Sequence, residues 1–589
     1  MFAAGLPTRC LRYPYERRTD SHAQYASRSQ RVSRPAARGV PMNGEAITAR
    51  DRWIAAALTV AVFVILFVSE RDLGVAWDEP VYTTGGERIV AWLGLLGDGL
   101  RRGDLSAALD PTAIGYSFGL GHEHPPLAKL ASGLGWALTR AWLPLPTAQR
   151  VGPMAISALL LGLIYWALRQ AAVGRVAALV GGLAPLAMPR LFYHLHVAAL
   201  DAPAAAAWFL FVWAFWRLSE QRRWWAWLLP GGILGLALAT KLSAIVAPVA
   251  VGIWLLASRV RRRRWDLWGR LVLAGPLSFL IVIALYPWFW SETGSKLLFW
   301  VRFFTVSHYE ISQYYLGRVV LGPPWHFPLV IVLTTTPATL LALAAIGATR
   351  WARRDPQGEA AALWLINALT MIVWFMRPGS NAFDNDRLLA PTFVFLAPLV
   401  GLGVAATIGW LRRRMPGWER GRLRFLAPFA LALIAWGPGL LATARLHPYE
   451  LAYYNAIVGG LRGGQRLGLE TIYWATTYRA ALPEINRRAA PGATLWVTPN
   501  SYDVLYYYQR AGLLRVDLVI MRPPGWGSFY DDSGVHRAEG GIDDADFALV
   551  EYRQTSFVDA VPAYMAQRQP VWVLERDGVI LAALYARGP

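Results

Sequence analysis

The stretch WIAAALTVAVFVILFVS, Trp53–Ser69, decides the fold of this chain because it is long, apolar and free of charge. A helix needs about 20 such residues to cross the hydrocarbon core of a membrane. Uncharged runs near that length recur further along the chain, at 151–168, 176–189, 202–216, 224–240, 242–258, 271–291, 319–349, 360–376, 388–411 and 425–444. The sequence therefore predicts an α-helical polytopic membrane protein with about eleven spans.

Two of these runs depart from the expected length. The run 319–349 is too long for one span, and we expect it to begin in a loop. The run 176–189 is short, and we expect its helix to extend over Arg190 to Tyr193.

The distribution of Lys and Arg between the runs predicts the orientation of the chain. With the N-terminus placed in the cytoplasm, the short loops that fall inside carry 20 positive residues, whereas those that fall outside carry 7. Cytoplasmic loops of membrane proteins carry the excess of Lys and Arg. The asymmetry predicts a cytoplasmic N-terminus and places the segment after the last span outside.

Residues 126–143 are also apolar, but a span there would move every later loop to the other side and invert the charge bias. Lys129 lies within this segment, and Pro144 and Pro146 follow it. We therefore expect a helix that lies at the outer surface or dips partway in. The loop 70–150 then lies wholly outside and carries interfacial helices.

The two ends of the chain differ from the membrane domain, which we assign to residues 51–444. Residues 1–50 are polar and basic and contain no signal-peptide core, so we expect a disordered cytoplasmic tail, or a segment that precedes a start at Met42. Residues 445–589 alternate helical stretches with short β-rich runs, which predicts an extracytoplasmic α/β domain. The expected elements are strands at Thr494–Thr498, Val516–Met521, Ala548–Tyr552 and Val571–Leu574 and a helix at Tyr478–Ala489.

Composition excludes several classes of function. The net charge of +20 is compatible with nucleic-acid binding, but the Arg residues form short clusters between apolar runs, which is typical of membrane loops. The single cysteine, Cys10, excludes a disulfide framework and a cysteine-based metal site. We therefore expect membrane lipids, and not nucleic acid, as partners.

An acidic pair, Asp78 and Glu79, lies in the sequence Trp77-Asp78-Glu79-Pro80 where the first span meets the longest outer loop. Acidic residues before a helix at 80–96 would suit its N-terminal dipole, which is a purely structural explanation. Carboxylates at a membrane surface are also costly unless they are solvated or used in function. Their position favours a functional role.

The outer loop also carries the sequence Gly121-His122-Glu123-His124-Pro125-Pro126-Leu127-Ala128-Lys129. The two His residues with Glu123 offer ligands for a divalent metal, but the spacing resembles a loop and no further ligand is evident. We therefore expect no metal and no other cofactor. Lys129 either extends toward the lipid headgroups or holds a phosphate as a point charge.

Further polar residues fall on the same predicted face. Asp201 ends the segment Tyr193-His194-Leu195-His196-Val197-Ala198-Ala199-Leu200-Asp201, Lys241 lies in a tight outer turn, and Arg387 opens the tenth span. Carboxylates and cations gathered at one surface would suit an anionic lipid carrier and a hydroxyl that needs deprotonation.

In these motifs the chain resembles the C-type membrane glycosyltransferases, specifically the group of protein O-mannosyltransferases and lipid A aminoarabinose transferase (glycosyltransferase family 39-like). The resemblance covers roughly residues 50–450. It rests on the acidic pair, on His124 to Lys129, on Asp201 with Pro203, on Lys241, on Pro324-Trp325-His326 and on Arg387-Leu388-Leu389. A stretch from His447 to Asn455, followed by the Gly-rich run Gly459–Gly464, resembles bacterial members with an outer tail domain. We expect a turn at this run and a location in the bacterial inner membrane.

The resemblance implies an inverting sugar transfer from a polyprenyl-phosphate donor to an acceptor hydroxyl of a protein, glycan or lipid. It implies that Asp78 is the general base and that Glu79 and Asp201 assist. It assigns the donor phosphate to Lys129, Arg387 and Lys241, and the substrate pocket to His124, His196 and His326.

Two other classes of function stay open. A transporter would place ionisable groups near the middle of the bilayer, whereas the predicted spans are nearly free of charge. A non-catalytic scaffold would present the tail domain, and its function would survive the change Asp78→Asn.

Overall fold

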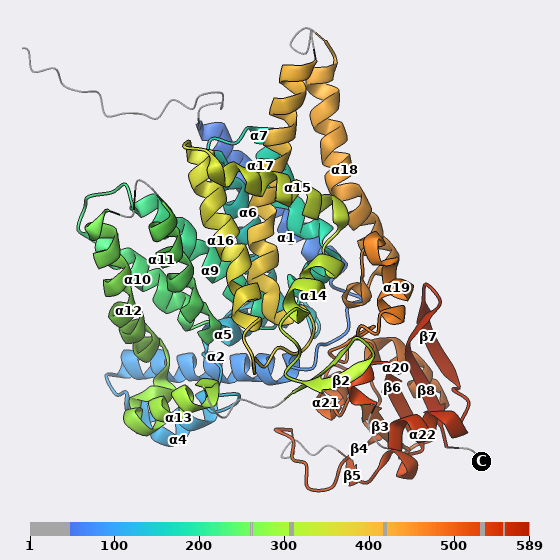
Figure 1. Ribbon diagram of the computed structural model, residues 1–589. Coiled ribbons are helices and arrows are strands. Elements are labelled where there is room, and N and C mark those ends of the chain that lie inside the picture. The colour runs from blue at the N-terminus through green and yellow to red at the C-terminus, as the bar shows by residue number, and fades with distance from the viewer. Residues whose placement is uncertain are drawn as a thin grey trace, which may run out of the picture. The chain divides into compact units, whose positions relative to one another are not determined.

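The computed structural model describes residues 47–258, 261, 263–305, 311–415, 421–530, 536–557 and 560–587. Contacts divide the chain into residues 1–42 and one compact unit, residues 43–589. Most of the predicted cytoplasmic tail, 1–50, therefore lies outside the described residues, as does Cys10. Within the compact unit, a bundle of apolar helices is followed by a region with a β-sheet (Figure 1).

Helices cover all the predicted apolar runs. Among the described residues, six helices are long and apolar enough to cross a membrane, or up to seven if one bent pair counts as a span. The class of polytopic helical membrane protein is thus confirmed, whereas the count of eleven stays a prediction. The helices on the runs are α1 (Ala49–Ser69), α6 (Thr147–Gln170), α7 (Arg175–Leu183), α9 (Asp201–Leu218), α10 (Trp225–Leu238), α11 (Ala247–Ala257), α12 (Trp265–Leu285), α14 (Phe327–Thr335), α15 (Ala338–Ala348), α16 (Pro356–Phe375), α17 (Ala390–Arg414) and α18 (Leu423–Leu446).

Two of the spanning helices leave most of their apolar side chains exposed. Only 17% of the apolar window of α1 and 11% of that of α18 is buried inside the protein. Val60 is 63% exposed and Phe429 is also 63% exposed. In water such a surface would be an aggregation hazard, whereas hydrocarbon solvates it.

Proline interrupts two of the predicted spans. The expected continuous helix over 176–193 is wrong: α7 passes into a 3₁₀ turn at Ala184–Ala187 and then into α8 (Pro189–His194). Pro185 and Pro189 lack the N–H that a continuing helix needs, so the chain turns there. Likewise α14 and α15 meet at 113° before Pro337, and the run 319–349 begins, as predicted, outside a helix.

The loop 70–150, which is predicted to lie outside, is built on helices that cross beneath the bundle (Figure 1). The longest, α2 (Glu79–Arg102), extends six residues beyond the predicted end at 96 and packs on α5 (Leu127–Thr139). A Cβ on Gly86 would lie 2.2 Å from the backbone oxygen of Lys129, so only glycine permits this approach. At 13 residues α5 is about 20 Å long, too short to span. The loop also contains α3 (Ser106–Leu109) and α4 (Pro111–Phe118).

A second long connecting segment lies between α12 and α14. It contains α13 (Thr293–Thr305) and a hairpin of β1 (Ser312–Tyr315) with β2 (Arg318–Leu321), in which Gln313 is opposite Val320. The hairpin was not expected from the sequence. An isolated bridge from Tyr315 to Leu469 joins it to the region after the last span.

The C-terminal region forms a six-stranded mixed sheet in the order β5-β4-β3-β6-β8-β7, with β5, β4, β3 and β6 parallel. The α/β character predicted for residues 445–589 is confirmed, and β8 pairs antiparallel to β6 and β7. The strands are β3 (Thr494–Thr498), β4 (Val519–Arg522), β5 (Arg537–Glu539), β6 (Phe547–Glu551), β7 (Trp572–Arg576) and β8 (Val579–Ala586), and the helices are α19 (Gly460–Arg466), α20 (Tyr478–Arg488), α21 (Tyr502–Arg510) and α22 (Ala560–Gln567). The Gly-rich run 459–464 was expected to be a turn, but most of it starts α19.

Hydrogen bonds from backbone amides tie this sheet region to the loop 70–150. The amide of Val75 donates to the hydroxyl of Tyr508 at 2.8 Å, and the amide of Trp77 donates to the carbonyl of Trp474 at 2.9 Å. The side chain of Val75 is fully buried in the apolar cluster beneath the sheet. The residues just before Asp78 are therefore held by the C-terminal region.

Candidate active site

Arg387 binds three carboxylates at once. Arg387 begins the 3₁₀ turn Arg387–Leu389, which leads into α17, and its side chain is 7% exposed. The Nε atom lies 2.9 Å from Asp201, Nη1 lies 2.9 Å from Asp384, and Nη2 pairs with Asp78. The planar fork of five N–H donors suits such convergent binding.

Two further cations complete this group. Lys241 Nζ lies 2.5 Å from Asp201 Oδ1, and Arg553 Nη2 lies 2.7 Å from Asp384 Oδ1. We define the ion cluster as Asp78, Asp201, Asp384, Lys241, Arg387 and Arg553. Its three carboxylates and three cations balance, as buried charges require. The ring of Trp474 covers Arg387, with 4.6 Å between Cζ and the ring centroid.

Distant parts of the chain supply the ion cluster. Asp78 precedes α2, Asp201 begins α9, and Lys241 follows α10. Asp384 and Arg387 lead into α17, and Arg553 follows β6 in the C-terminal sheet. The structure thus brings together four of the predicted site residues: Asp78, Asp201, Lys241 and Arg387.

Asp78 is the carboxylate most open to an incoming group. Its side chain is 26% exposed, against 2% for Asp201 and 8% for Asp384. Burial raises the pKa of Asp78 above its ordinary value, and Arg387 opposes that rise. A carboxylate with a raised pKa is a stronger base, which suits proton abstraction from a hydroxyl.

The backbone beside the ion cluster is strained at two pairs of adjacent residues. Asp384 and Asn385 have φ values of 52° each, and Trp474 and Ala475 have φ values of 78° and 61°. Side chains other than glycine rarely adopt this left-handed region, and the cost persists only where neighbours enforce it. Here the amide of Asn385 donates to Gln313, and that of Ala475 donates to the buried carboxylate of Glu551.

Glu79 lies next to Asp78 in sequence but turns away from the ion cluster. Its carboxylate is 1% exposed and pairs with Arg150, with 2.6 Å between Oε2 and Nη2. The amides of Ala76 and Ala198 each donate to it at 2.8 Å. These contacts join the outer loop to α6 and to the segment before α9, so they make Glu79 a structural support.

Lys129 is also buried, at 2% exposure, and its ammonium donates to three backbone carbonyls. The acceptors are Leu120 at 3.0 Å, Gly121 at 2.6 Å and His124 at 3.0 Å. Burial lowers the pKa of Lys129 to about 8. In this structure Lys129 orders the loop 120–124, and its expected phosphate contact stays a prediction.

The three predicted pocket histidines have separate environments. His124 packs edge-on against Tyr82 with 5.7 Å between ring centroids, and burial lowers its pKa well below the ordinary value. His196 is fully buried, with its ring nitrogens 2.6 Å from the Phe192 carbonyl and 2.9 Å from the Ser69 hydroxyl. His326 lies 2.7 Å from the Tyr315 hydroxyl at the start of α14.

Sequence reasoning missed several residues of the site. Asp384 is three residues before Arg387, a spacing that signals an ion pair on one turn. Asp386 forms a second buried pair with Arg190 at 2.7 Å and accepts from the Tyr473 hydroxyl. No signal in the sequence pointed to Arg553 or Trp474, because the C-terminal region folds back over a separation of more than 80 residues.

The histidines and acids of the loop 70–150 are residue types that bind divalent metals. Across the part of the chain that the structure describes, no group of three or more His, Cys, Asp or Glu side chains is arranged to hold a metal ion. His122 instead stacks near Trp288, with 4.8 Å between ring centroids.

Comparison with known proteins supports the sequence resemblance. A family model described as dolichyl-phosphate-mannose-protein mannosyltransferase matches residues 123–290, a range that contains Lys129, Asp201 and Lys241. No curated protein matches the chain significantly in sequence.

Solved structures with similar folds include two of ArnT from Cupriavidus metallidurans. The structure bound to undecaprenyl phosphate is 17% identical with a TM-score of 0.48, and the apo structure is 18% identical with a TM-score of 0.49. Each comparison covers 91% of this chain and 98% of the other. Arabinofuranosyltransferase AftD from Mycobacteria is 14% identical over 92% of this chain and 42% of that one, with a TM-score of 0.39.

The family match and the sequence motifs agree on the class of protein. The match over residues 123–290 confirms the resemblance to the protein O-mannosyltransferase group. The chain is a multi-pass membrane protein that is similar, over residues 123–290, to the dolichyl-phosphate-mannose-protein mannosyltransferases.

Proposed function

We propose that this chain transfers a sugar from a polyprenyl-phosphate donor to an acceptor hydroxyl on the extracytoplasmic side of the membrane. The observation that carries the proposal is the ion cluster, in which Asp78 and Asp201 share Arg387. The family match supports a donor in which the sugar is linked to a lipid phosphate. The acceptor, whether protein, glycan or lipid, stays open.

In the proposed reaction Asp78 removes the proton from the acceptor hydroxyl. The acceptor oxygen forms a bond to the anomeric carbon as the bond from that carbon to the phosphate oxygen breaks. The electron pair of the broken bond leaves with the lipid phosphate, and the sugar inverts at the anomeric carbon. Asp78 suits the role because it is the most exposed carboxylate of the ion cluster and burial raises its pKa.

The cations of the ion cluster suit the leaving group. The departing phosphate gains negative charge, and fixed cations near that charge lower the barrier. Nη2 of Arg387 is paired with Asp78, so it can bind the phosphate of the sugar donor only if it releases Asp78. We propose that this exchange frees Asp78 as a base when donor is bound, while Asp201 keeps Arg387 and Lys241 in place.

The arrangement of the chain in the membrane belongs to the same proposal. We infer about eleven spans, a cytoplasmic N-terminus and an extracytoplasmic C-terminal domain in a bacterial inner membrane. The domain boundaries at 51–444 and 445–589 are part of this proposal. The charge bias of the loops supports it, as does the ion cluster, which joins predicted outer residues and no predicted inner ones.

The proposal is tested with purified protein in liposomes that contain a polyprenyl-phosphate sugar, by following loss of donor. Asp78→Asn is expected to lower turnover by about 10² to 10⁴, the usual contribution of a general base. Asp98→Asn is the matched control, because Asp98 is an exposed acid of α2, the helix that Asp78 precedes, and its ion pair with Arg101 lies at the surface. Turnover that is equal in Asp78→Asn and the control would refute the base assignment.

A further inference from the structure

A pocket lined by arginines lies at the end of α17 opposite the ion cluster. Its volume is about 600 Å³, and it lies between the last turns of α17 and the 3₁₀ turn Thr349–Ala352 that follows α15. Arg387 and Arg413 are 26 residues apart, which is about 39 Å along a helix. We call it the arginine pocket and define it by Arg350, Arg353, Arg413, Ile346, Thr407 and Trp410.

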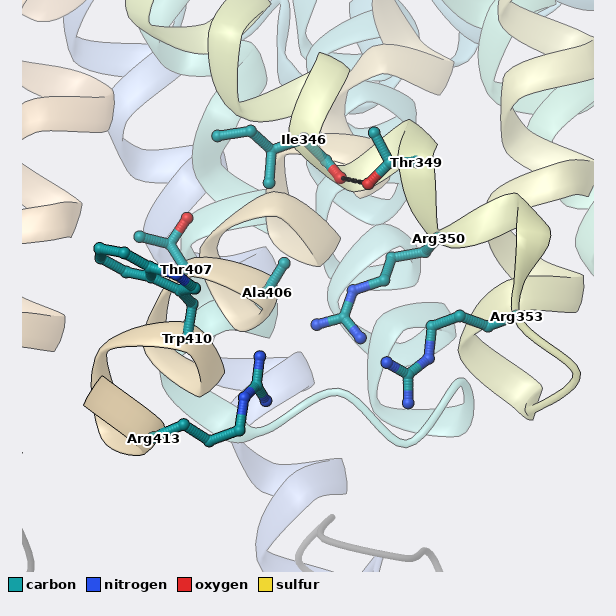
Figure 2. A pocket seen from close by; sticks show the side chains of 8 residues that line it. All are labelled: Ile346, Thr349, Arg350, Arg353, Ala406, Thr407, Trp410 and Arg413. Atoms are coloured by element: carbon teal, nitrogen blue, oxygen red, sulfur yellow. Dashed lines mark hydrogen bonds between the residues drawn. The ribbon is translucent and has the colours of Figure 1, made fainter. Parts of the chain in front are cut away.

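Three guanidinium groups meet in the arginine pocket. In Figure 2 Arg350 and Arg413 point toward each other across the cavity, and Arg353 lies beside Arg350. Arg353 pairs with Asp355 at 2.7 Å. Within the described residues, Arg350 and Arg413 form no ion pair. Like charges gathered in this way repel, and an anion between them relieves the repulsion.

Two large apolar side chains of the lining are exposed. Ile346 is 42% exposed and Trp410 is 52% exposed. Both lie at the ends of apolar helices, where tryptophan commonly meets the headgroup level of a membrane. A free phosphate needs no such surface, whereas a lipid presents a phosphate with acyl chains directly beside it.

The cavity exists because of how the two helices cross. A Cβ on Gly403 would lie 1.9 Å from the Leu343 carbonyl oxygen, and one on Gly347 would lie 1.9 Å from that of Leu399. These glycines let the helix backbones touch. Beyond this contact α15 ends at Ala348 while α17 continues to Arg414, so a gap opens between them.

We propose that the arginine pocket binds the phosphate headgroup of an anionic membrane lipid in the leaflet opposite the reaction. Arg350 and Arg413 hold the phosphate oxygens, and Ile346 and Trp410 pack against the start of the acyl chains. Basic pockets between helices on the cytoplasmic side of membrane proteins favour anionic headgroups. The site is separate from the ion cluster, so its function does not depend on sugar transfer.

The test uses the full chain in detergent, with its unfolding midpoint followed by tryptophan fluorescence as lipid is added. Phosphatidylglycerol is expected to raise the midpoint in a saturable way, because a ligand that binds only the folded state stabilises it. Phosphatidylcholine and inorganic phosphate at equal concentration are expected to have little effect. An equal rise with phosphatidylcholine would overturn the role of the anionic headgroup, and an equal rise with phosphate alone would overturn the lipid.

Paired variants then locate the site. Arg350→Gln with Arg413→Gln is expected to weaken the apparent affinity for phosphatidylglycerol about thirtyfold, or about fivefold for each arginine. Arg354→Gln with Arg414→Gln is the matched control, since these exposed neighbours carry the same charge outside the pocket. Each variant is compared with its own lipid-free midpoint. Equal affinities for the two double variants would refute the pocket.

If the double variant Arg350→Gln with Arg413→Gln shows no cooperative unfolding, the double variant Arg350→Lys with Arg413→Lys is used in its place. Lysine keeps the charge but loses the planar fork, so an intermediate loss of affinity is expected. Unchanged affinity in the lysine pair, together with no preference of the unmodified protein for phosphatidylglycerol, would contradict the proposal.

Discussion

At the scale of single residues, the feature that organises the site is the sharing of Arg387 among three acids. Asp384 is held from its other side by Arg553, which comes from the C-terminal region. The guanidinium of Arg553 also lies 5.8 Å from the ring of Trp77, next to Asp78. On the proposed function, we therefore expect Arg553 to be a positioning residue that acts through its neighbours.

Arg553→Gln is expected to lower donor turnover by about tenfold or more, because Asp384 then draws Arg387 away from Asp78 and the donor phosphate. Arg553→Lys, which keeps the charge, is expected to recover part of the loss. Initial rates over a range of donor concentrations give kcat and KM for each variant. Arg568→Gln changes a pair at the surface of the same region and is the control; equal rates in all variants would contradict the positioning role.

At the scale of elements, the sequence predicted most helices and part of the sheet. The β-rich run Thr494–Thr498 matched β3 with its observed ends, and the helix at 478–489 matched α20 to one residue. β8 was missed because Val579–Ala586 is a continuous apolar run, which periodicity alone does not distinguish from a helix. For residues 176–193 the prediction of one continuous helix rested on length and hydropathy. Two prolines in this segment instead break the helix.

The hairpin β1–β2 is joined to the C-terminal region by a short chain of hydrogen bonds. The amide of Tyr314 donates to the Thr555 hydroxyl at 2.9 Å, and that hydroxyl donates to Glu470. The amide of Thr555 also donates to Glu470 at 3.0 Å. Burial raises the pKa of Glu470 to about 7, so this junction responds to pH in the neutral range.

The free energy of unfolding is expected to depend on pH through Glu470. Since the folded pKa lies above the ordinary value of 4.5, the folded state holds the proton more tightly than the unfolded state. The stabilisation is complete below about pH 4.5 and is lost as the pH rises to about 7, by roughly 3 kcal/mol. Glu470→Gln should flatten this part of the stability profile, measured by thermal unfolding between pH 4.5 and 7.5. Glu575→Gln, at an exposed strand, should leave the profile unchanged, and a parallel profile in Glu470→Gln would contradict the assignment.

At the scale of the whole molecule, charge patterning predicted which residues share a face. The 20 to 7 bias placed Asp78, Asp201, Lys241 and Arg387 on one side, and the structure joins them. Charge patterning predicted that the residues after the last span form a separate domain. It predicted no part for them in the site. Arg553 and Trp474 reach the site through tertiary folding of a polar region, where neither periodicity nor the positive-inside rule applies.

The orientation is tested with single cysteines in a Cys10→Ser background. Arg102→Cys in the first outer loop and Arg487→Cys in the C-terminal region are expected to react with a membrane-impermeant maleimide in intact spheroplasts, since both side chains are exposed. Arg222→Cys, between α9 and α10, is expected to react only after the membrane is opened. Labelling of Arg222→Cys before Arg487→Cys would reverse the proposed orientation.

The contact between Arg553 and Asp384 has a consequence for how the protein is made. When residues up to the end of α18 have emerged from the ribosome and entered the membrane, the acids outnumber the cations around Arg387, because Arg553 has not yet been synthesised. The charges balance only after the chain beyond β6 has been synthesised and has folded against Asp384. On the proposed function, we therefore expect a nascent chain that ends before Arg553 to lack the assembled ion cluster and to be inactive.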